Sequence, residues 1–444
     1  MVDPQSASHE RAAPESSRPR PVYLVDGART PFLKARGEPG PFSPVDLAVQ
    51  CGRPLVMRHP VPPEAYDQVI LGCVNVVPSE MNPARIAALR MGMGDAMPAF
   101  TVQINCGSGM QSVDTAFRYI RDGRGELILA GGTEALSRAP MMLPDAAVQW
   151  LSGLNKASSV QDYAQQISRL NPKDFKPEIS LAQGLTDPIV GMSMGQTAEL
   201  LAHQFSISRR RADEYAASSH QRLARAAEQG WLSDEIVPAV SPDGRLFSKD
   251  DGVRPDTSPE SLAKLKPAFE PPYGQVTPGN SSQVTDGASW LILASEEAVE
   301  RYGLEPQAVI VDSEWSALNP SIMGLGPVLS STALLSRHQI DLHDVDLWEI
   351  NEAFAAQVLA CVAAWDDAAF CRIALGREQP VGQLDMRKLN IDGGAVALGH
   401  PVGASGNRIV LHLMKALSRE GLRKGVATEC IGGGQSGAML IETI

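Results

Sequence analysis

The 444-residue chain predicts an α/β protein built from two similar halves. Short apolar runs typical of buried strands alternate with segments of helical periodicity along most of the sequence. Late in each half an apolar run ends in glycines, at residues 129–132 and again at residues 430–434. We therefore expect mainly parallel strands, with the functional groups at the junction of the halves, beyond the strand ends.

Composition excludes several classes of protein. Apolar residues make up 43% of the chain and charged residues 20%, as in an ordinary globular protein. The net charge, 39 − 51 = −12, argues against nucleic acid or an anionic membrane as the main partner. No apolar run is long enough for a transmembrane segment. The six cysteines show no C-x-x-C spacing, which suits a reducing compartment, so we expect a cytoplasmic protein.

The first half is predicted to span residues 21–296, after a disordered tail at residues 1–20 that is rich in Ser, Pro and Ala. Its expected elements are strands at 22–25, 68–77, 100–104 (buried) and 127–130, a helix at 83–91 capped by Asn82, and a helix that ends near Arg121. From 138 to 267 the strand-like runs become sparse, which indicates an inserted lobe with amphipathic helices at 194–204 and 209–229. The core should resume near Phe269, with a strand at 289–294.

The second half, residues 297–444, repeats this outline. The pattern predicts strands at 308–312 and 346–350 and helices at 327–338, 352–364 and 405–419.

Cys106 lies in the small-residue turn Asn105-Cys106-Gly107-Ser108-Gly109, at the mouth of a predicted helix. Unpaired N–H groups and the helix dipole lower the pKa of a thiol there, and the thiolate is the nucleophilic form. A buried structural cysteine is the alternative, and this stretch alone does not separate the two.

Three further segments carry polar groups in unusual settings. Asn351 follows a strand, where it either points into a site or caps the next helix. His400 lies in a loop so rich in glycine that we favour a functional role over a packing role. Cys430 precedes three glycines whose N–H groups can bind an oxyanion. The formal G-x-G-x-x-G that ends at Gly437 is not a dinucleotide site, because only seven residues follow it. No histidine shows the spacing of metal ligands, so no metal is expected.

Four motifs in order, N-C-G-S-G at Cys106, N-E-A-F-A-A-Q at Asn351, G-G-A-V-A-L-G-H-P-V-G-A-S-G at His400 and C-I-G-G-G-Q-S-G at Cys430, resemble those of the thiolase family. The resemblance extends over residues 22–442. It implies a five-layered αβαβα thiolase fold made of two related halves, with a loop lobe inserted in the first. It also implies cleavage of 3-ketoacyl-CoA by CoA, or the reverse Claisen condensation, through an acyl-cysteine intermediate. Coenzyme A would be a co-substrate, with no cofactor bound permanently.

The resemblance implies a role for each catalytic residue. Cys106 would be acylated, with His400 taking its proton. Cys430 would act as the acid and base at the α-carbon. Asn351, through a held water, and His400 would stabilise the enolate oxygen. The backbone N–H groups of Cys106 and Gly432 would form a second oxyanion hole.

The same resemblance places the substrate. Arg254, Ser261 and Ser282 look like contacts to CoA. Met194 and Phe354 would flank the reacting acyl group.

Residues 141–192 and 365–388 look more like the 3-ketoacyl-CoA thiolases of the fatty-acid oxidation complexes than like the short-chain enzymes. That similarity implies a homodimer or homotetramer that acts on acyl-CoA, with a hydratase/dehydrogenase subunit as a possible partner. A short-chain biosynthetic acetyl-CoA acetyltransferase stays an alternative.

Other enzyme classes fit less well. The second thiol, Cys430, argues against a decarboxylating ketoacyl synthase, which uses a second histidine there. A cysteine protease built on Cys106, His400 and Asn351 fits poorly with the glycine-rich oxyanion loops. Retention of both thiols and of His400 argues against a non-catalytic scaffold.

Overall fold

The computed structural model describes residues 20–444. The predicted tail, residues 1–20, lies outside the described residues except for Arg20, whose guanidinium is 2.5 Å from a carboxylate oxygen of Glu297. Among the described residues no helix is both long and apolar enough to span a membrane.

The described strands form one ten-stranded sheet and two small two-stranded sheets. The strands of the first half are, from the outer edge inward, β4 (Ala99–Val102), β3 (Gln68–Gly72), β5 (Leu127–Ala135), β10 (Thr285–Ser295) and β1 (Val22–Arg29), with β2 (Leu33–Lys34) beside β10. Those of the second half are β12 (Leu347–Ile350), β13 (Lys424–Ile431), β14 (Gln435–Thr443) and β11 (Ala308–Ala317). A short pairing of β1 with β11 joins the halves.

The two halves repeat one strand order. In the first half β3 and β5 are parallel, and β10 and β1 follow antiparallel. In the second half β12 and β13 are parallel, and β14 and β11 follow antiparallel. The expectation of mainly parallel strands was wrong, because each half returns through two antiparallel strands.

Helices separate and cover the two halves, which gives five layers. The first layer is α1 (Pro44–Met57) and α2 (Pro83–Met91), packed on the first half of the sheet in one apolar cluster. The middle layer is α3 (Ser108–Arg121) and α15 (Val402–Glu420), which pack against both halves in a second cluster. The last layer is α11 (Gly326–Arg337) and α12 (Ala355–Asp366), which cover the second half in a third.

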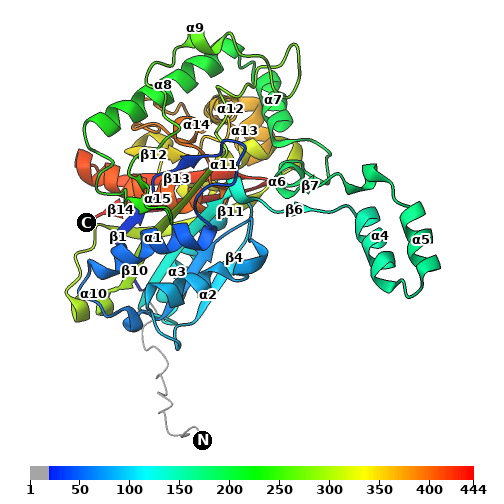
Figure 1. Ribbon diagram of the computed structural model, residues 1–444. Coiled ribbons are helices and arrows are strands. Elements are labelled where there is room, and N and C mark those ends of the chain that lie inside the picture. The colour runs from blue at the N-terminus through cyan, green and yellow to red at the C-terminus, as the bar shows by residue number, and fades with distance from the viewer. Residues whose placement is uncertain (1–19) are drawn as a thin grey trace, which may run out of the picture.

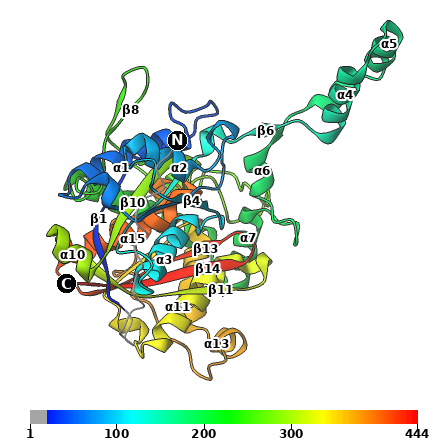
Figure 2. The same ribbon diagram turned by 90° about the horizontal axis from the view of Figure 1, so that it is seen from below.

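The inserted lobe has two parts that differ in packing. Helices α7 (Met194–Gln204) and α8 (Arg209–Glu228) lie on the body and share its third cluster. Residues 141–189, here called the arm, project from the body (Figures 1 and 2). The arm contains β6 (Met141–Met142), α4 (Asp145–Lys156), α5 (Val160–Ser168), η4 (Pro172–Phe175), β7 (Glu178–Ile179) and α6 (Ser180–Gly184).

The remaining elements are short. They are η1 (Pro63–Ala65), η2 (Pro78–Glu80), η3 (Leu136–Arg138), β8 (Ala239–Val240), β9 (Leu246–Phe247), α9 (Pro259–Leu262), α10 (Glu296–Tyr302), η5 (Pro320–Leu325), η6 (Leu342–Asp344), α13 (Ala368–Leu375) and α14 (Ala395–Leu398).

Three local expectations need correction. β4 is half-buried rather than buried, because it is the edge strand with β3 as its only partner in the described sheet. Asn82 occupies the N-cap position of α2, but its side chain makes no capping hydrogen bond; its φ is +53°, and its side-chain amide donates to the carbonyl of Ala99 at 3.2 Å. The strand predicted at 289–294 begins earlier, at Thr285.

Candidate active site

Cys106 lies in the turn between β4 and α3, at the junction of the two halves. Ser108 fixes this turn, since its hydroxyl accepts from the N–H of Ile104 at 2.9 Å and donates to the carbonyl of Asn105 at 2.7 Å. The side-chain amide of Asn105 donates to the carbonyl of Gly432 at 2.8 Å. The turn of the first half is thereby held against the glycine loop of the second.

Gly107 shows how close this approach is. A Cβ atom at Gly107 would lie 2.4 Å from Cδ1 of Ile431, well inside van der Waals contact. A larger residue beside Cys106 would therefore displace the side chain of Ile431.

The thiol of Cys106 is half-buried. Burial raises its pKa most, the carboxyl groups of Glu429 and Glu134 add to the rise, and backbone hydrogen bonds from Gly432 and Cys106 itself lower it, so that the pKa is about 12. The expectation that the helix mouth yields a resting thiolate was wrong, because desolvation outweighs the local N–H groups. The resting nucleophile is a thiol, and it needs a base.

His400 follows α14 and directly precedes the first turn of α15. Its Nδ1 lies 2.6 Å from the hydroxyl oxygen of Ser405, and that hydroxyl also donates to the carbonyl of Pro401 at 3.3 Å. The Ser405 oxygen therefore accepts from Nδ1–H, which leaves the lone pair on Nε2. Nε2 is buried and has no partner within residues 20–444. Burial, together with Arg408, lowers the pKa of His400 to about 4, so the ring is neutral and able to accept a proton.

The first turns of α15, which follow His400, pack directly on α3, the helix after Cys106. A Cβ atom at Gly109 would lie 2.7 Å from the backbone nitrogen of Asn407 and 2.9 Å from the carbonyl of Gly403. The buried carboxylate of Glu134 adds a second link, because it accepts from the N–H groups of Gly403 at 3.1 Å and Asn75 at 2.9 Å. Burial raises the pKa of Glu134 to about 7.

Cys430 is the second-to-last residue of β13 and is only 1% exposed. Burial raises the pKa of its thiol, and the next largest contribution comes from Cys106, so the two sulfurs are close enough to influence each other. The adjacent Glu429 is fully buried, and its pKa is also raised by burial. Cys430 is therefore protonated at neutral pH and able to act as an acid.

Asn351 extends the pairing of β12 with β13, since its N–H donates to the carbonyl of Thr428 at 2.9 Å. Helix α12 begins only at Ala355, with Phe354 at the N-cap, so the reading of Asn351 as a cap was wrong. Both polar atoms of its buried side chain lack a partner among the described residues. Buried polar groups are normally hydrogen-bonded, so this amide is free to bind a ligand or water.

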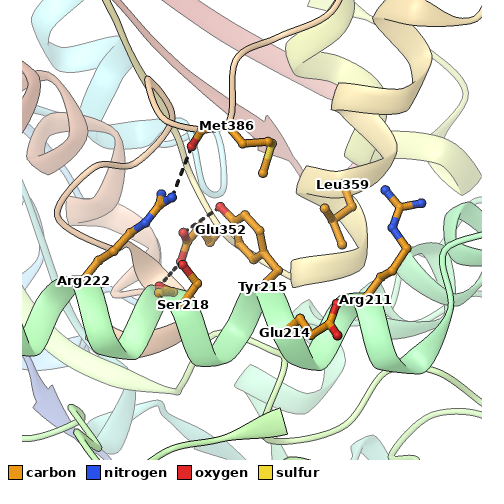
Figure 3. Close-up of a pocket in the computed structure, with 9 residues that line it drawn as sticks. Arg211, Glu214, Tyr215, Ser218, Arg222, Glu352, Leu359 and Met386 are labelled. Atoms are coloured by element: carbon orange, nitrogen blue, oxygen red, sulfur yellow. Dashed lines mark hydrogen bonds between the residues drawn. The ribbon is translucent and has the colours of Figure 1, made fainter.

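Glu352 anchors the segment that carries Asn351 (Figure 3). Its carboxylate accepts from the Tyr215 hydroxyl at 2.8 Å, the Ser219 hydroxyl at 2.7 Å and the Asn390 amide at 2.9 Å. It also accepts from the N–H of Val396 at 3.1 Å. One carboxylate thus connects three segments: helix α8 of the lobe, the chain after β12, and residues 390–396, which precede His400.

A cavity of about 310 Å³ opens on Cys106. Gly432 and Met194 line it, together with Val74, Asn75, Asn105, Val402, Gly433 and, from the base of the arm, Ser180, Leu181, Gly184, Leu185, Thr186, Asp187, Pro188 and Ile189. The structure thus brings three of the predicted site residues, Cys106, Gly432 and Met194, to one cavity.

The predicted CoA contacts lie outside this cavity. Arg254 and Ser261 are exposed on the lobe, and the Ser261 hydroxyl donates to the carbonyl of Ser258 at 2.8 Å. Ser282 is half-buried, and its N–H donates to the carbonyl of Ala353 at 2.9 Å. Phe354 packs edge-on against Phe269, with 6.1 Å between the ring centroids. The binding roles of these residues stay predictions.

Several supporting residues were missed at the level of sequence. Ser405 and Glu352 both lie inside the motifs given above. Each is a polar residue in an apolar or glycine-rich run, and that setting could have indicated a supporting role in the site. Glu134, a charged residue near the end of the buried strand β5, carried a similar signal. Asn105 carried none, because its positive φ of 46° and its bond to Gly432 depend on a partner 327 residues away.

Comparisons with known proteins agree along the whole described chain. Residues 22–297 match the model of the thiolase N-terminal domain, and residues 304–443 match that of the thiolase C-terminal domain. The human mitochondrial trifunctional enzyme subunit beta is 37% identical over 424 residues, which is 95% of this chain and 88% of that protein. The β-ketoadipyl-CoA thiolase of Pseudomonas aeruginosa is 39% identical over 431 residues, 96% of this chain and 100% of that one.

Solved structures also resemble this chain over nearly its whole length. The Bacillus anthracis acetyl-CoA acetyltransferase superimposes with a TM-score of 0.83 at 36% identity, covering 97% of this chain and 100% of that one. Human mitochondrial 3-ketoacyl-CoA thiolase in complex with CoA gives a TM-score of 0.82 at 36% identity, covering 96% and 98%. The chain belongs to the thiolase family and is an acyltransferase of the thiolase type.

Proposed function

We propose that this enzyme works in the degradative direction, cleaving 3-ketoacyl-CoA with CoA to acetyl-CoA and a shortened acyl-CoA. The observation that carries the proposal is the cavity of about 310 Å³ beside the Cys106 sulfur, with Leu181, Leu185 and Ile189 in its wall. One water molecule occupies about 30 Å³, so this space far exceeds the need of an acetyl group. An apolar wall suits an alkyl chain.

The first half-reaction transfers the acyl group to the enzyme. Nε2 of His400 takes the thiol proton of Cys106 as the sulfur attacks the keto carbon. The bond between the α-carbon and the keto carbon then breaks, and the electron pair stays on the acetyl-CoA enolate. The Cys430 thiol protonates the α-carbon, which releases acetyl-CoA and leaves a thioester on Cys106.

The second half-reaction reverses these roles with CoA. The Cys430 thiolate takes the proton of the CoA thiol, whose sulfur attacks the acyl-cysteine carbonyl. The Cys106 sulfur leaves and recovers its proton from His400. Burial sets the protonation states from which this exchange starts, since it raises the pKa of both cysteine thiols and lowers that of His400.

Charge on oxygen develops twice in this scheme, and two sets of donors are placed for it. The N–H groups of Cys106 and Gly432, which both act on the Cys106 sulfur, would hold the oxyanion of the attacked carbonyl. The unpartnered amide of Asn351 and His400 would hold the enolate oxygen. Loss of one such donor typically costs about 2.7–4 kcal/mol of transition-state stabilisation.

The similarity to an acetyl-CoA acetyltransferase supports a second candidate, the short-chain biosynthetic condensation. A series of kcat/KM values over 3-ketoacyl-CoAs of rising chain length separates the two. We expect kcat/KM to rise beyond acetoacetyl-CoA, with Cys106→Ala as the inactive control. A maximum at acetoacetyl-CoA would favour the short-chain enzyme instead.

We also propose a cytoplasmic homodimer or homotetramer that uses β4 as a contact. β4 is an edge strand, and edge strands offer unpaired backbone groups to a second chain. The relative named trifunctional enzyme subunit beta supports a hydratase/dehydrogenase subunit as a further partner. All six cysteines are free, which fits a reducing compartment. Light scattering after gel filtration, with and without such a subunit, measures the assembly.

A further inference from the structure

The base of the arm forms one side of the cavity on Cys106. Residues 180–189, here called the cavity wall, comprise α6 and the loop that follows it. Leu185 is 41% exposed and Ile189 is 82% exposed, although both line the cavity. Large apolar side chains left open to solvent beside a nucleophile gain from contact with an apolar ligand.

The cavity lacks a cation. None of the sixteen described residues that line it is Lys, Arg or His. Lys173 and Lys176 line a neighbouring open groove that shares Thr186 and Pro188 with the cavity, and neither lysine lines the cavity itself. A carboxylate that entered the cavity would therefore lose water without gaining a counter-charge, which is unfavourable.

The cavity wall also carries a negative charge of its own. Asp187 is only 3% exposed, and its Oδ1 accepts from the N–H groups of Ile189 at 2.8 Å and Val190 at 3.1 Å. These bonds hold the carboxylate in a fixed turn, so it cannot swing away from a ligand. A buried charge is screened less by salt than an exposed one, and it repels a like charge in the same cavity.

We propose that the cavity wall makes the enzyme selective for ketoacyl chains that end in an uncharged alkyl group, and that it rejects chains of equal length that end in a carboxylate. The inference rests on the proposed function and names the substrate class of that site. Leu181, Leu185 and Ile189 supply the apolar contacts, and Asp187 supplies the repulsion.

The test compares two substrates with six-carbon acyl chains, 3-ketohexanoyl-CoA and 3-ketoadipyl-CoA, with purified full-length enzyme. We expect kcat/KM to favour 3-ketohexanoyl-CoA by at least about tenfold, in the range of discrimination that pocket contacts provide. Wild-type enzyme that cleaves both equally, or prefers 3-ketoadipyl-CoA, would overturn the proposal while leaving thiolysis intact.

Two variants locate the selectivity. Leu185→Lys places a cation in the cavity wall at an already exposed position. The terminal carboxylate of 3-ketoadipyl-CoA then gains a counter-charge, so the kcat/KM preference for 3-ketohexanoyl-CoA should fall by about tenfold. Asp187→Asn keeps an oxygen for the N–H groups of Ile189 and Val190 but removes the charge, so the preference should also narrow. If neither substitution changes the ratio of the two kcat/KM values, the cavity wall does not discriminate between charged and uncharged chains, and the proposal is wrong.

Leu170→Lys is the matched control. Leu170 is 44% exposed on the arm but does not line the cavity, so the same change in net charge should leave the ratio as in wild type. A ratio that shifts equally in this control would trace the effect to overall charge and overturn the proposal. If wild-type enzyme cleaves neither substrate and no acyl group forms on Cys106, the proposed function itself fails.

Discussion

The hydroxyl oxygen of Ser405 lies 2.6 Å from Nδ1 of His400, and it is the partner of that ring in the first turn of α15. Because the same hydroxyl donates to the carbonyl of Pro401, it accepts from the ring and fixes the tautomer. The lone pair of Nε2 is thereby set before any substrate arrives.

Replacement of Ser405 by alanine should lower kcat about tenfold, the equivalent of one hydrogen bond to a polar group. The KM for CoA should change little, because Ser405 would act through His400 alone. Steady-state kinetics measures both. Ser331→Ala is the control, since the buried Ser331 hydroxyl has no partner among the described residues. Equal losses in the two variants would indicate a general packing effect.

Alkylation of Cys106 by iodoacetamide should be slow at neutral pH. With a pKa raised to about 12 by burial, the thiolate fraction should rise about tenfold per pH unit from pH 7 to pH 10. A free cysteine peptide, by contrast, levels off above its pKa of about 8.5. Peptide mass spectrometry of timed samples gives the rate at Cys106. A plateau near pH 7 would show a resting thiolate and contradict the structure.

The raised pKa of Cys106 could not be predicted from the sequence, whereas the loops around the site could. The turn around Cys106 and the glycine loops at His400 and Cys430 were predictable, because glycine spacing and polar residues after strands are local signals. The sign of the pKa shift of Cys106 was not predictable, since it depends on the burial of the thiol and on Glu134 and Glu429, which are distant in the sequence. Antiparallel return strands were also missed, because an apolar run does not reveal the direction of its neighbour.

Stability should fall at alkaline pH through His412. Burial alone would lower its pKa, but Glu235 and Asp392 outweigh burial and raise it to about 10. The folded state therefore keeps a proton that the unfolded state releases above about pH 6.5, so this contribution is present below pH 6.5 and is lost as the pH rises toward 10. The expected slope is about 1.4 kcal/mol per pH unit between these limits.

Urea unfolding at pH 7 and pH 9 measures that slope. His412→Gln should remove it, although the variant is less stable at both pH values. His203→Gln, at an exposed position on α7, should keep the wild-type slope. A wild-type slope that survives in His412→Gln would assign the effect to another group.

Glu352 should be needed for stability as well as for the position of Asn351. Glu352→Ala leaves the hydroxyls of Tyr215 and Ser219 and the N–H of Val396 buried without their acceptor. Each unpaired buried group costs about 1–3 kcal/mol, so we expect a loss of about 4 kcal/mol or more in the free energy of unfolding. Glu214→Ala, on α8 next to Tyr215, is the control. Glu214 is exposed, and its only ion pair in the described structure is with Arg210. Chemical denaturation separates the two; a loss below about 1 kcal/mol at Glu352 would contradict the assigned network.

Cys430→Ala should separate acyl transfer from carbon–carbon bond chemistry. The buried thiol would supply the proton to the α-carbon, and general acid catalysis typically contributes about 10²–10⁴-fold. Transfer of an acyl group from a simple acyl-CoA to Cys106 needs no proton at carbon, and the departing CoA thiolate can take its proton from water in place of Cys430, so that step should continue. Mass spectrometry of the Cys106 peptide after incubation with acetyl-CoA detects the label, while thiolysis of acetoacetyl-CoA reports bond cleavage.

The control is Cys51→Ala, which replaces a buried cysteine of the first apolar cluster and should retain both activities. Full thiolysis in Cys430→Ala would place the acid elsewhere, and Glu429, whose pKa is raised by burial beside it, would be the next group to test.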